Sequence, residues 1–392
     1  MNISREIDLI HGMPEWGLTP DQRMIRSSVL DLLERILPRP LIMQLDEAGE
    51  FPAEAYRALA EAGWMGLPFE SAYGGMNLGY MDLVVLIETL AYYWNGISSA
   101  YLTTVVLGGG HIKLYGNEDQ KQRFLPGIIS GEKRFAFSLT EPPAGSDAVA
   151  IRTRAVQEGN EWVITGSKIY TTGAHVADHL IVATKTDPDA GHRGITMFIV
   201  DTKAKGVTIR PLKGLGRRTL HTNEIFFDEV RVPDQDRLGE VNEGWGNLMK
   251  CLNLERTVIA ASHVGNSQRV VDYAKNHALQ RVQFGKPITK FQAVAHKFAD
   301  MQMLTECARL ITYKVAAMMD QGEAPVMETS MAKVIATENN VRVVDRGMQI
   351  MGGASYMMEF EMQMYYRDCR IGPIGAGANE IQRTVIAKQM GL

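Results

Sequence analysis

The segment EWVITGSKIYTT, residues 161–172, decides the fold of this chain. It is rich in β-branched and aromatic residues, and the turn-forming pair Gly159-Asn160 precedes it, which is typical of a β-strand. Four more segments of the same character surround it: RFAFSLT, HLIVATKT, GITMFIVD and NEIFFDEVRV, at residues 134–140, 179–186, 194–201 and 223–232. Because no helical segment alternates with them, we predict a small antiparallel β-barrel or sandwich and not a parallel nucleotide-binding sheet.

Helical patterns precede this strand-rich block. In residues 21–37 the apolar residues recur at helical spacing, and Pro38 and Pro40 end the pattern. The next helix is expected to open with Pro52 and to end near Gly63. A third segment, GYMDLVVLIETLAYYW, is apolar nearly all round, which predicts a buried helix.

Helical patterns also follow the strands. From about Asn242 the sequence pattern is helical again. Residues 244–280 are expected to form one very long helix, with at least three more helices after it. We therefore expect an α+β protein: an N-terminal α-helical domain over 1–132, a middle β domain over 133–241 and a C-terminal helix bundle over 242–392. A length of 392 residues suits two or three domains.

Composition excludes several classes of protein. A net charge of −4 is too small to favour nucleic acid or an anionic membrane as the main partner. No apolar run approaches the roughly 18 residues that a membrane-spanning helix needs. The first residues, MNISREIDLIHGMPEWG, have acids and no apolar core, so we expect neither a signal peptide nor a transit peptide, and a cytoplasmic protein.

Several weaker signals favour structural roles. Cys251, Cys307 and Cys369 form neither a CxxC pair nor a zinc spacing, which indicates buried, reduced thiols. His175 and His179 stand four apart but without an HExxH glutamate, so a metal site is not expected. The segment GLGRRT, residues 214–219, lacks the third glycine of a dinucleotide fingerprint, and the triple glycine at 108–110 indicates a helix end or close packing.

Five segments together carry a stronger signal: LTEPPAGSD, GSKIYTTGAHVADHLIVAT, RVQFGKPITKFQ, QIMGG and IGAGANEIQR, at residues 139–147, 166–184, 281–292, 349–353 and 374–383. Their order and separation resemble those of the acyl-CoA dehydrogenase family, from about residue 20 to the end of the chain. The resemblance implies FAD as cofactor, an acyl-CoA substrate and electron-transferring flavoprotein as electron acceptor. It also implies a homotetramer built as a dimer of dimers, and a place in fatty acid or branched-chain amino acid catabolism.

The resemblance implies three groups of FAD-binding residues. In the first two segments the matching positions lie along the flavin: Phe137, Leu139, Thr140, Ser146, Tyr170, Thr171 and Thr172. An aromatic ring suits a flat isoalloxazine, and a hydroxyl donor polarises it for hydride uptake. The next group is implied to reach the FAD of a neighbouring subunit: Arg281, Phe284, Gln292, Gln349, Gly352 and Gly353. Ala378, Asn379 and Glu380 match the helix start that closes over the diphosphate, where helix N-termini favour phosphate.

The catalytic base follows from a pair of correlated differences. The commonest family pattern carries the base in a Tyr-Glu-Gly-Thr turn, but the matching turn here is Gly375-Ala376-Gly377-Ala378. A minority of the family, including isovaleryl-CoA and long-chain dehydrogenases, carries the base in an LxLER motif on the long helix, and residues 252–256 read LNLER. The resemblance therefore implies Glu255 as the base. The structural alternative is that Glu255 and Arg256 form a solvated pair on a helix surface.

The resemblance also bears on the substrate. The substrate-binding positions that it implies are Ser146, Asn253, Arg256, Ala376 and Gly377. Ser98 stands where glutaryl-type enzymes have an arginine for the distal carboxylate, which argues against a dicarboxylyl-CoA. Gly246 replaces a tyrosine of the isovaleryl enzymes, which indicates a larger or differently shaped acyl pocket.

Two alternatives remain open at this stage. One is an acyl-CoA reductase or oxidase that uses the same base with another electron partner. The other is a relative with different chemistry, a flavin monooxygenase or a nucleic-acid-associated flavoprotein, neither of which needs Glu255. The net charge of −4 does not support the nucleic-acid class.

Overall fold

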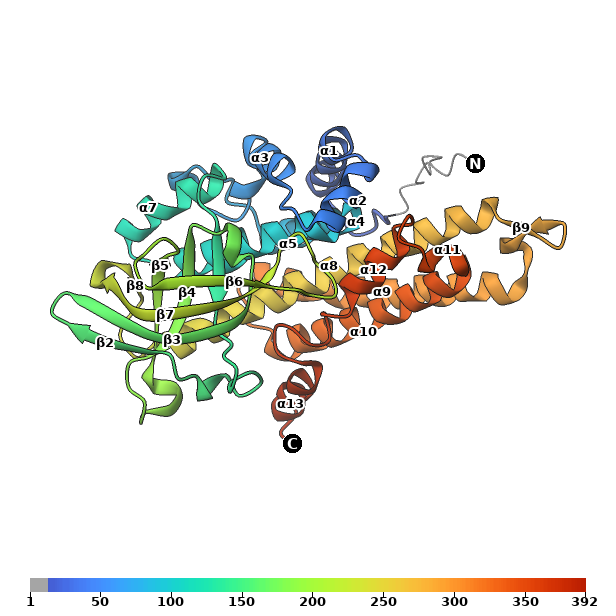
Figure 1. Ribbon diagram of the computed structural model, residues 1–392. Helices are drawn as coiled ribbons and strands as arrows, with labels where there is room; N and C mark the ends of the chain where they lie inside the picture. Colours follow the sequence, from blue (N-terminus) through green and yellow to red (C-terminus); the bar gives the residue numbers. More distant parts are fainter. Residues whose placement is uncertain (1–12) are drawn as a thin grey trace. The chain divides into compact units, whose positions relative to one another are not determined.

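The structure is a computed structural model that describes residues 13–392. Along the chain, helices extend to Ile129, strands follow from Phe135 to Leu238, and helices resume at Gly244 (Figure 1). The predicted order of helices, sheet and helices is therefore confirmed. Residues 1–12, which hold most of the segment used to exclude a leader peptide, lie outside the described part.

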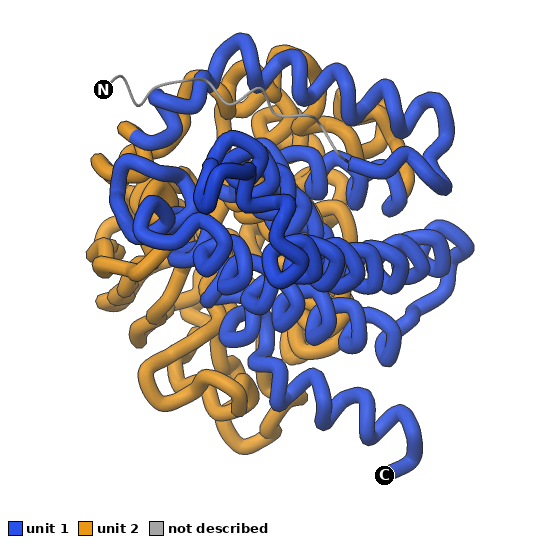
Figure 2. Tube along the Cα trace, turned by 90° about the vertical axis from the view of Figure 1, so that its right-hand side faces the viewer, with its two compact units in different colours: residues 1–43, 80–95, 256–392 blue, residues 44–79, 96–255 orange. Residues whose placement is uncertain are grey.

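Two compact units divide the chain (Figure 2). The first combines the chain up to Met43 with Tyr80–Asn95 and Arg256–Leu392, and the second combines Gln44–Gly79 with Gly96–Glu255. The division between the units falls within one long helix, between Glu255 and Arg256. The three sequence domains expected above stay a prediction, because the compact units gather segments that are far apart in the sequence.

The first unit is helical. Its helix α1 (Pro20–Ile36) begins with a capping box, in which the Thr19 side chain accepts from the backbone N–H of Gln22 and the Gln22 side chain accepts from the backbone N–H of Thr19. The other elements of this unit are α4 (Tyr80–Tyr93), most of α8 (Gly244–Gln280), the hairpin of β9 (Val282–Gln283) and β10 (Lys286–Pro287), α9 (Gln292–Asp320), α10 (Val326–Met351), α11 (Gly353–Tyr356), α12 (Met362–Cys369) and α13 (Asn379–Gln389).

Hydrogen bonds from α9 and a tight backbone contact with α8 fix α4 in this unit. Arg309 and Tyr313 of α9 donate to the buried Glu88 carboxylate at 3.0 Å and 2.7 Å. On α8, a Cβ added at Gly265 would lie 2.1 Å from the backbone oxygen of Glu88, so only glycine permits this helix contact. The prediction of a buried helix at residues 79–94 is confirmed, with α4 spanning Tyr80–Tyr93.

Helix α2 (Arg39–Ala48) is one of the helices that were not predicted from the sequence. The prolines at 38 and 40 were expected to end helical structure until Pro52, but α2 begins between them. The reason is that Pro40 lies in the first turn of α2, where its missing N–H has no intrahelical partner to lose.

The helices of the second unit pack with little space between backbones. They are α3 (Ala53–Glu61), α5 (Asn95–Tyr101), the π-helix η3 (Leu102–Gly109), α6 (Gly110–Tyr115) and α7 (Glu118–Ile129). A Cβ at Gly108 would lie 2.2 Å from Phe135, and a Cβ at Gly109 would lie 2.3 Å from the ring of Phe69. Close packing is therefore the role of these two glycines.

The sheet of the second unit has its strands in the order β6-β7-β3-β2-β4-β5-β8, with β1 paired to β4. Pairing is mainly antiparallel, but β1 and β2 both pair with β4 in the parallel direction. Three strands of this sheet, β2, β6 and β8, were not predicted from the sequence. The bounds are β1 (Phe135–Ser138), β2 (Arg154–Glu158), β3 (Glu161–Thr172), β4 (His179–Lys185), β5 (Ile195–Asp201), β6 (Val207–Leu212), β7 (Thr222–Pro233) and β8 (Arg237–Leu238).

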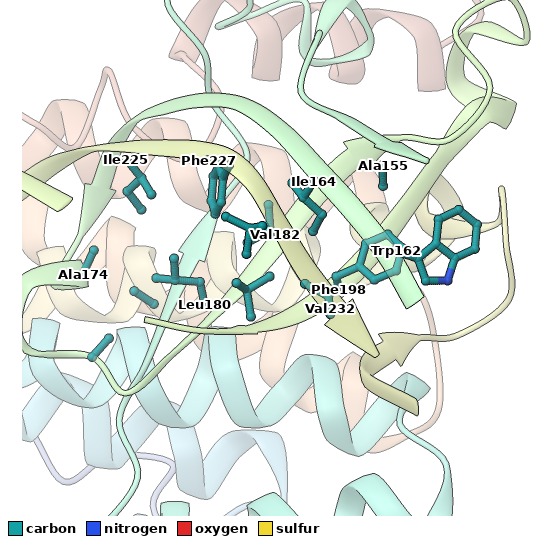
Figure 3. Close-up of a cluster of buried hydrophobic side chains, with 14 residues drawn as sticks. Ala155, Trp162, Ile164, Ala174, Leu180, Val182, Phe198, Ile225, Phe227 and Val232 are labelled. Carbon is teal, nitrogen blue, oxygen red and sulfur yellow. The ribbon is translucent and has the colours of Figure 1, made fainter. Parts of the chain in front are cut away.

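Alternation along the strands builds the core of this sheet (Figure 3). Trp162 and Ile164 of β3 are buried two residues apart, as the strand period requires. Their neighbours come from other strands, and the rings of Trp162 and Phe198 lie 5.3 Å apart. The same core includes Ala136 of β1, which is next to the candidate site residue Phe137.

Three further expectations can be compared with the structure. No helix in residues 13–392 is long and apolar enough to cross a membrane. No cluster of three or more potential metal ligands occurs in that part of the chain. The cysteine prediction was partly wrong, because Cys251 and Cys369 are buried but Cys307 is exposed on α9.

Candidate active site

A buried ion pair fixes the segment that follows β1. Lys168 of β3 donates to the Glu141 carboxylate at 2.7 Å and to the backbone oxygen of Leu139 at 2.9 Å. The backbone N–H of Ile169 also donates to the backbone oxygen of Thr140, at 2.9 Å. These bonds fix the backbone of Leu139 and Thr140, two of the residues that the resemblance assigns to the flavin, while Ser146 lies exposed in the following turn.

Both members of this pair stay charged at neutral pH. Burial lowers the pKa of Lys168 to about 8, and Glu141 opposes this effect. Burial alone would raise the pKa of Glu141, but Lys168 and the backbone N–H groups of Arg152 and Thr153 lower it overall. A charged pair inside the protein keeps a defined geometry because each group needs the other.

Tyr170 is exposed and conformationally strained at the end of β3. Its φ of 62° lies in the left-handed region, at a break in the β3–β7 register between Lys168 and Thr171. Its side chain is 64% exposed, although a large aromatic ring is usually covered. Strained non-glycine residues cluster at functional sites, and an exposed ring there is suited to contact a flat ligand.

The two threonines after Tyr170 differ in environment. Thr171 is buried, and its hydroxyl lies 3.1 Å from the Ser138 hydroxyl, so its side chain belongs to the interior. Thr172 is partly exposed, which leaves its hydroxyl available for a ligand. Sequence reasoning placed both threonines along the flavin, and their burial favours Thr172 as the side chain that contacts it.

Glu255 is a buried carboxylate on α8, with 9% of the residue exposed. Cys251 lies one turn earlier on the helix, and burial together with the charge of Glu255 raises the pKa of Cys251 to about 12. Leu254 faces α6, where a Cβ on Gly110 would lie 4.0 Å from its side chain. The alternative of a solvated Glu255–Arg256 surface pair is wrong, since Arg256 is buried as well.

In the first unit, buried polar side chains hold the turn at residues 375–378. Lys333 donates to the backbone oxygen of Gly377 at 2.9 Å, and Gln382 donates to the same oxygen at 3.1 Å. Arg256 approaches the backbone oxygen of Ala376 at 3.5 Å. Ala376 and Gly377 both have positive φ, so the turn is sharply bent and needs this support.

Helix α13 begins directly after that turn without a side-chain cap. The Asn379 side chain is directed into the protein, because it accepts from Lys333 at 2.8 Å and donates to Thr337 at 3.1 Å. The backbone N–H of Asn379 donates to the backbone oxygen of Pro373 at 3.0 Å, so the backbone N–H groups that follow it in the first turn of α13 are the donors suited to an anion at this end. Asn379 supports the helix start through its side chain, and Glu380 is exposed in the first turn.

The residues predicted to reach a neighbour's cofactor are exposed. Arg281, Gln292 and Gln349 lie at the surface, and Phe284 is 94% exposed with a φ of 51° on the β9–β10 hairpin. Near Gly352 and Gly353, a Cβ would meet nothing within 4 Å. A glycine turn with this much open space can accept a ligand close to its backbone.

Each unit, taken by itself, offers groups that suit one part of a flavin dinucleotide. The second unit offers an exposed ring at Tyr170 and a hydroxyl at Thr172, next to a strand that a buried ion pair holds in place. The first unit offers the uncapped N-terminus of α13, where backbone N–H groups suit a diphosphate. The sequence analysis did not identify Lys168, Glu141 or Lys333 as site residues. Lys168 and Glu141 lie within two of the five family-like segments. The available signal for Lys168 was its place in the strand, an even number of residues from the apolar Trp162 and Ile164.

Comparison with known proteins places the chain in a family. Family models of the acyl-CoA dehydrogenase N-terminal, middle and C-terminal domains match residues 19–132, 136–230 and 242–391. The caffeyl-CoA reductase-Etf complex subunit CarC of Acetobacterium woodii is 38% identical over 93% of this chain and 97% of its own length. The 3-(aryl)acrylate reductase of Clostridium sporogenes is 37% identical over 95% of this chain and 99% of its own.

A solved structure agrees with these relatives. Butyryl-CoA dehydrogenase from Megasphaera elsdenii has a TM-score of 0.93 and 34% identity, over 97% of this chain and 100% of that one. Relatives of this kind are FAD-dependent oxidoreductases. The matched segments span nearly the whole described chain, and the protein therefore belongs to the acyl-CoA dehydrogenase family.

Proposed function

We propose that this enzyme removes the α proton and the β hydride of an acyl-CoA thioester and so forms a trans-2-enoyl-CoA. The observation that carries the proposal is the buried Glu255 carboxylate in the LNLER segment, together with the absence of a carboxylate from the turn Gly375-Ala376-Gly377-Ala378. In this step the α C–H bond breaks and its proton goes to Glu255, while a C=C bond forms between Cα and Cβ. When bound, FAD accepts the β hydride.

The surrounding residues are proposed to position the flavin and to activate it for hydride uptake. Thr172 donates from its hydroxyl toward the flavin, and the Tyr170 ring covers it. Lys168 and Glu141 keep Leu139 and Thr140 in place, so the segment assigned to the flavin keeps a fixed geometry. The substrate contacts are assigned to Ser146, Asn253, Arg256, Ala376 and Gly377.

Two proposals concern partners and the acyl group. Arg281, Phe284, Gln292 and Gln349 are assigned to the FAD of a neighbouring subunit, which requires an oligomer, a dimer of dimers in the family pattern. Electrons are assigned to electron-transferring flavoprotein, and the Etf-complex name of one relative supports this. Ser98 is buried on α5 and offers no charge for a second carboxylate, which favours a monocarboxylyl-CoA.

A second candidate is the same step run in reverse, as a reductase of an aryl-substituted enoyl-CoA. The observation that favours it is the names of two relatives, a caffeyl-CoA reductase-Etf complex subunit and a 3-(aryl)acrylate reductase. Glu255 then donates the α proton instead of accepting it. Mixing the reduced enzyme with 3-arylacryloyl-CoA, and the oxidised enzyme with the saturated 3-arylpropanoyl-CoA, distinguishes the two physiological directions by rate.

The base can be tested with Glu255→Gln. We expect this variant to keep yellow FAD and to bind acyl-CoA, but to reduce its flavin about 10²–10⁴-fold more slowly, because removal of a general base has that effect. The measurement is anaerobic stopped-flow absorbance of the flavin with a panel of acyl-CoAs. Glu240→Gln, at an exposed carboxylate, serves as the matched control. A Glu255→Gln variant that bleaches at close to the wild-type rate would falsify the assignment and favour the monooxygenase-type alternative.

A further inference from the structure

His111 is a fully buried histidine that the proposed chemistry leaves unassigned. It lies in the first turn of α6, directly after the π-helix η3, and none of the residue is exposed. Its Nδ1 lies 2.5 Å from the backbone oxygen of Leu107. Its Nε2 is buried and has no hydrogen-bond partner within residues 13–392. A buried polar atom without a partner is costly, so it needs an explanation.

The bonding pattern determines what Nε2 can bind. A backbone oxygen only accepts, so Nδ1 carries the proton and donates to Leu107. Burial lowers the pKa of His111 to about 4, and the bond to Leu107 opposes this only in part, so the ring is neutral at pH 7. A neutral ring with its proton on Nδ1 leaves Nε2 as an acceptor. The missing partner is therefore an O–H or N–H donor.

The position of His111 connects it with the candidate site. Its ring stacks on Phe137 of β1, with ring centroids 5.0 Å apart, two residues before Leu139. The preceding residue, Gly110, faces Leu254, which is the neighbour of Glu255 in the sequence. The start of α6 thus contacts both the strand assigned to the flavin and the segment that carries the base, all within the second unit.

Packing is less tight at Gly110 than at the two glycines before it. A Cβ at Gly108 or Gly109 would collide with a phenylalanine ring, but a Cβ at the buried Gly110 would meet only Leu254, at 4.0 Å. One turn later on α6, the hydroxyl of Tyr115 is a second buried polar atom with no partner among the described residues. Residues four apart share a helix face, so two unpartnered polar groups lie on one side of α6.

We propose that His111 forms the polar end of the acyl pocket and selects acyl-CoAs whose acyl chain ends in a hydroxyl-bearing aromatic ring. The substrate hydroxyl donates to Nε2, and the substrate ring packs against the start of α6 at Gly110, near the ring of Phe137. Under this assignment His111 determines specificity and takes no part in the proton or hydride transfer. The inference rests on the proposed function, because it names the substrate class of that site.

The experiment uses the FAD-loaded enzyme and three CoA thioesters: 3-(4-hydroxyphenyl)propanoyl-CoA, 3-phenylpropanoyl-CoA and butanoyl-CoA. We expect wild type to favour the hydroxylated thioester over the phenyl one by roughly tenfold in kcat/KM, as one buried hydrogen bond allows. His111→Leu removes the acceptor and should abolish that preference through KM, with little change for the phenyl thioester. His111→Gln keeps an acceptor oxygen and should retain part of the preference.

Binding provides a readout that does not depend on turnover. The dissociation constants of the corresponding 2-enoyl-CoAs, measured by calorimetry on the oxidised enzyme, should show the same loss of preference in His111→Leu. If wild type does not distinguish the hydroxyl, or if both variants weaken all thioesters equally, the inference is wrong and His111 is a packing residue. If no acyl-CoA reduces the flavin, the proposed function fails, and the calorimetric comparison still decides the role of His111.

Discussion

Lys168 is the residue on which the geometry of the flavin strand depends, and its replacement provides a prediction. In Lys168→Met, the buried Glu141 loses its cationic partner, and breaking a buried pair in this way costs about 3–5 kcal/mol. We expect a lower urea midpoint and a lower FAD content, because the bond to the backbone oxygen of Leu139 is lost as well. Urea unfolding and the flavin-to-protein absorbance ratio are the measurements.

The control for this prediction is an exposed ion pair in the same sheet. Arg231 of β7 contacts Glu158 and Glu161 at the surface, so Arg231→Met should leave the urea midpoint and FAD content nearly unchanged. The double variant Lys168→Met/Glu141→Gln should recover part of the lost stability, since no buried charge remains unpaired. Equal effects of Lys168→Met and Arg231→Met would contradict the proposed role of the buried pair.

Among single residues, the sequence predicted those that belong to a linear motif. It did not predict those whose role depends on packing against distant parts of the chain. Glu255 and Tyr170 follow from linear patterns, and the burial of one and the exposed, strained backbone of the other agree with functional roles. The roles of Lys333 and His111 depend on contacts with Gly377 and Phe137, which lie 44 and 26 positions away in the sequence. No local pattern encodes such contacts.

Among the elements, the contact between α8 and α4 leads to a prediction. Gly265→Ala places a Cβ 2.1 Å from the backbone oxygen of Glu88, so the two helices have to separate. Overpacking of this kind costs about 1–3 kcal/mol, and more where backbone must move. We expect a clear loss in the urea midpoint and in thermal stability.

Gly246→Ala on the same helix is the matched control. A Cβ there would meet nothing within 4 Å, and Gly246 lies in the first turn of α8, where alanine suits the helix at least as well as glycine. This variant should therefore be as stable as wild type or slightly more stable. The contact argument is wrong if Gly265→Ala is also neutral or stabilising.

Elements with strong periodicity were predicted well, and short ones were not. The long helix at residues 244–280 and the strand at 161–172 agree with α8 and β3 to the residue. Strand β2 was missed because RAVQE is mostly polar and exposed, and its pairing with β3 forms it. Helix α2 was missed because two prolines were read as an end, although one of them suits a first turn.

The assembly of the whole helical unit depends on contacts between distant segments, and Glu361 makes several of them. Its carboxylate accepts from Arg39 of α2, from Arg269 of α8 at 3.3 Å, and from Tyr365 of α12. The Tyr365 hydroxyl in turn accepts from Arg269 at 2.9 Å. Sequence reasoning had no means to find this cluster, because its members lie up to 326 positions apart.

The cluster predicts how the stability of the molecule depends on pH. Burial alone would raise the pKa of Glu361, but the charges of Arg39 and Arg269 lower it from 4.5 to about 2. A carboxylate whose pKa is lowered in the folded state stabilises the protein above its unfolded pKa, and that contribution disappears as the pH falls through the folded pKa. The shift corresponds to about 3 kcal/mol at neutral pH, which is lost progressively between about pH 4.5 and pH 2.

Urea unfolding as a function of pH tests this, with Glu361→Gln as the comparison. At pH 7 the variant should be less stable than wild type, because Arg39 and Arg269 lose their buried counter-charge. As the pH falls toward 2, protonation removes the same charge from wild type, so the two free energies of unfolding should converge. A difference that stays constant over this range would mean that the Glu361 charge contributes nothing beyond packing, and that other contacts join these helices.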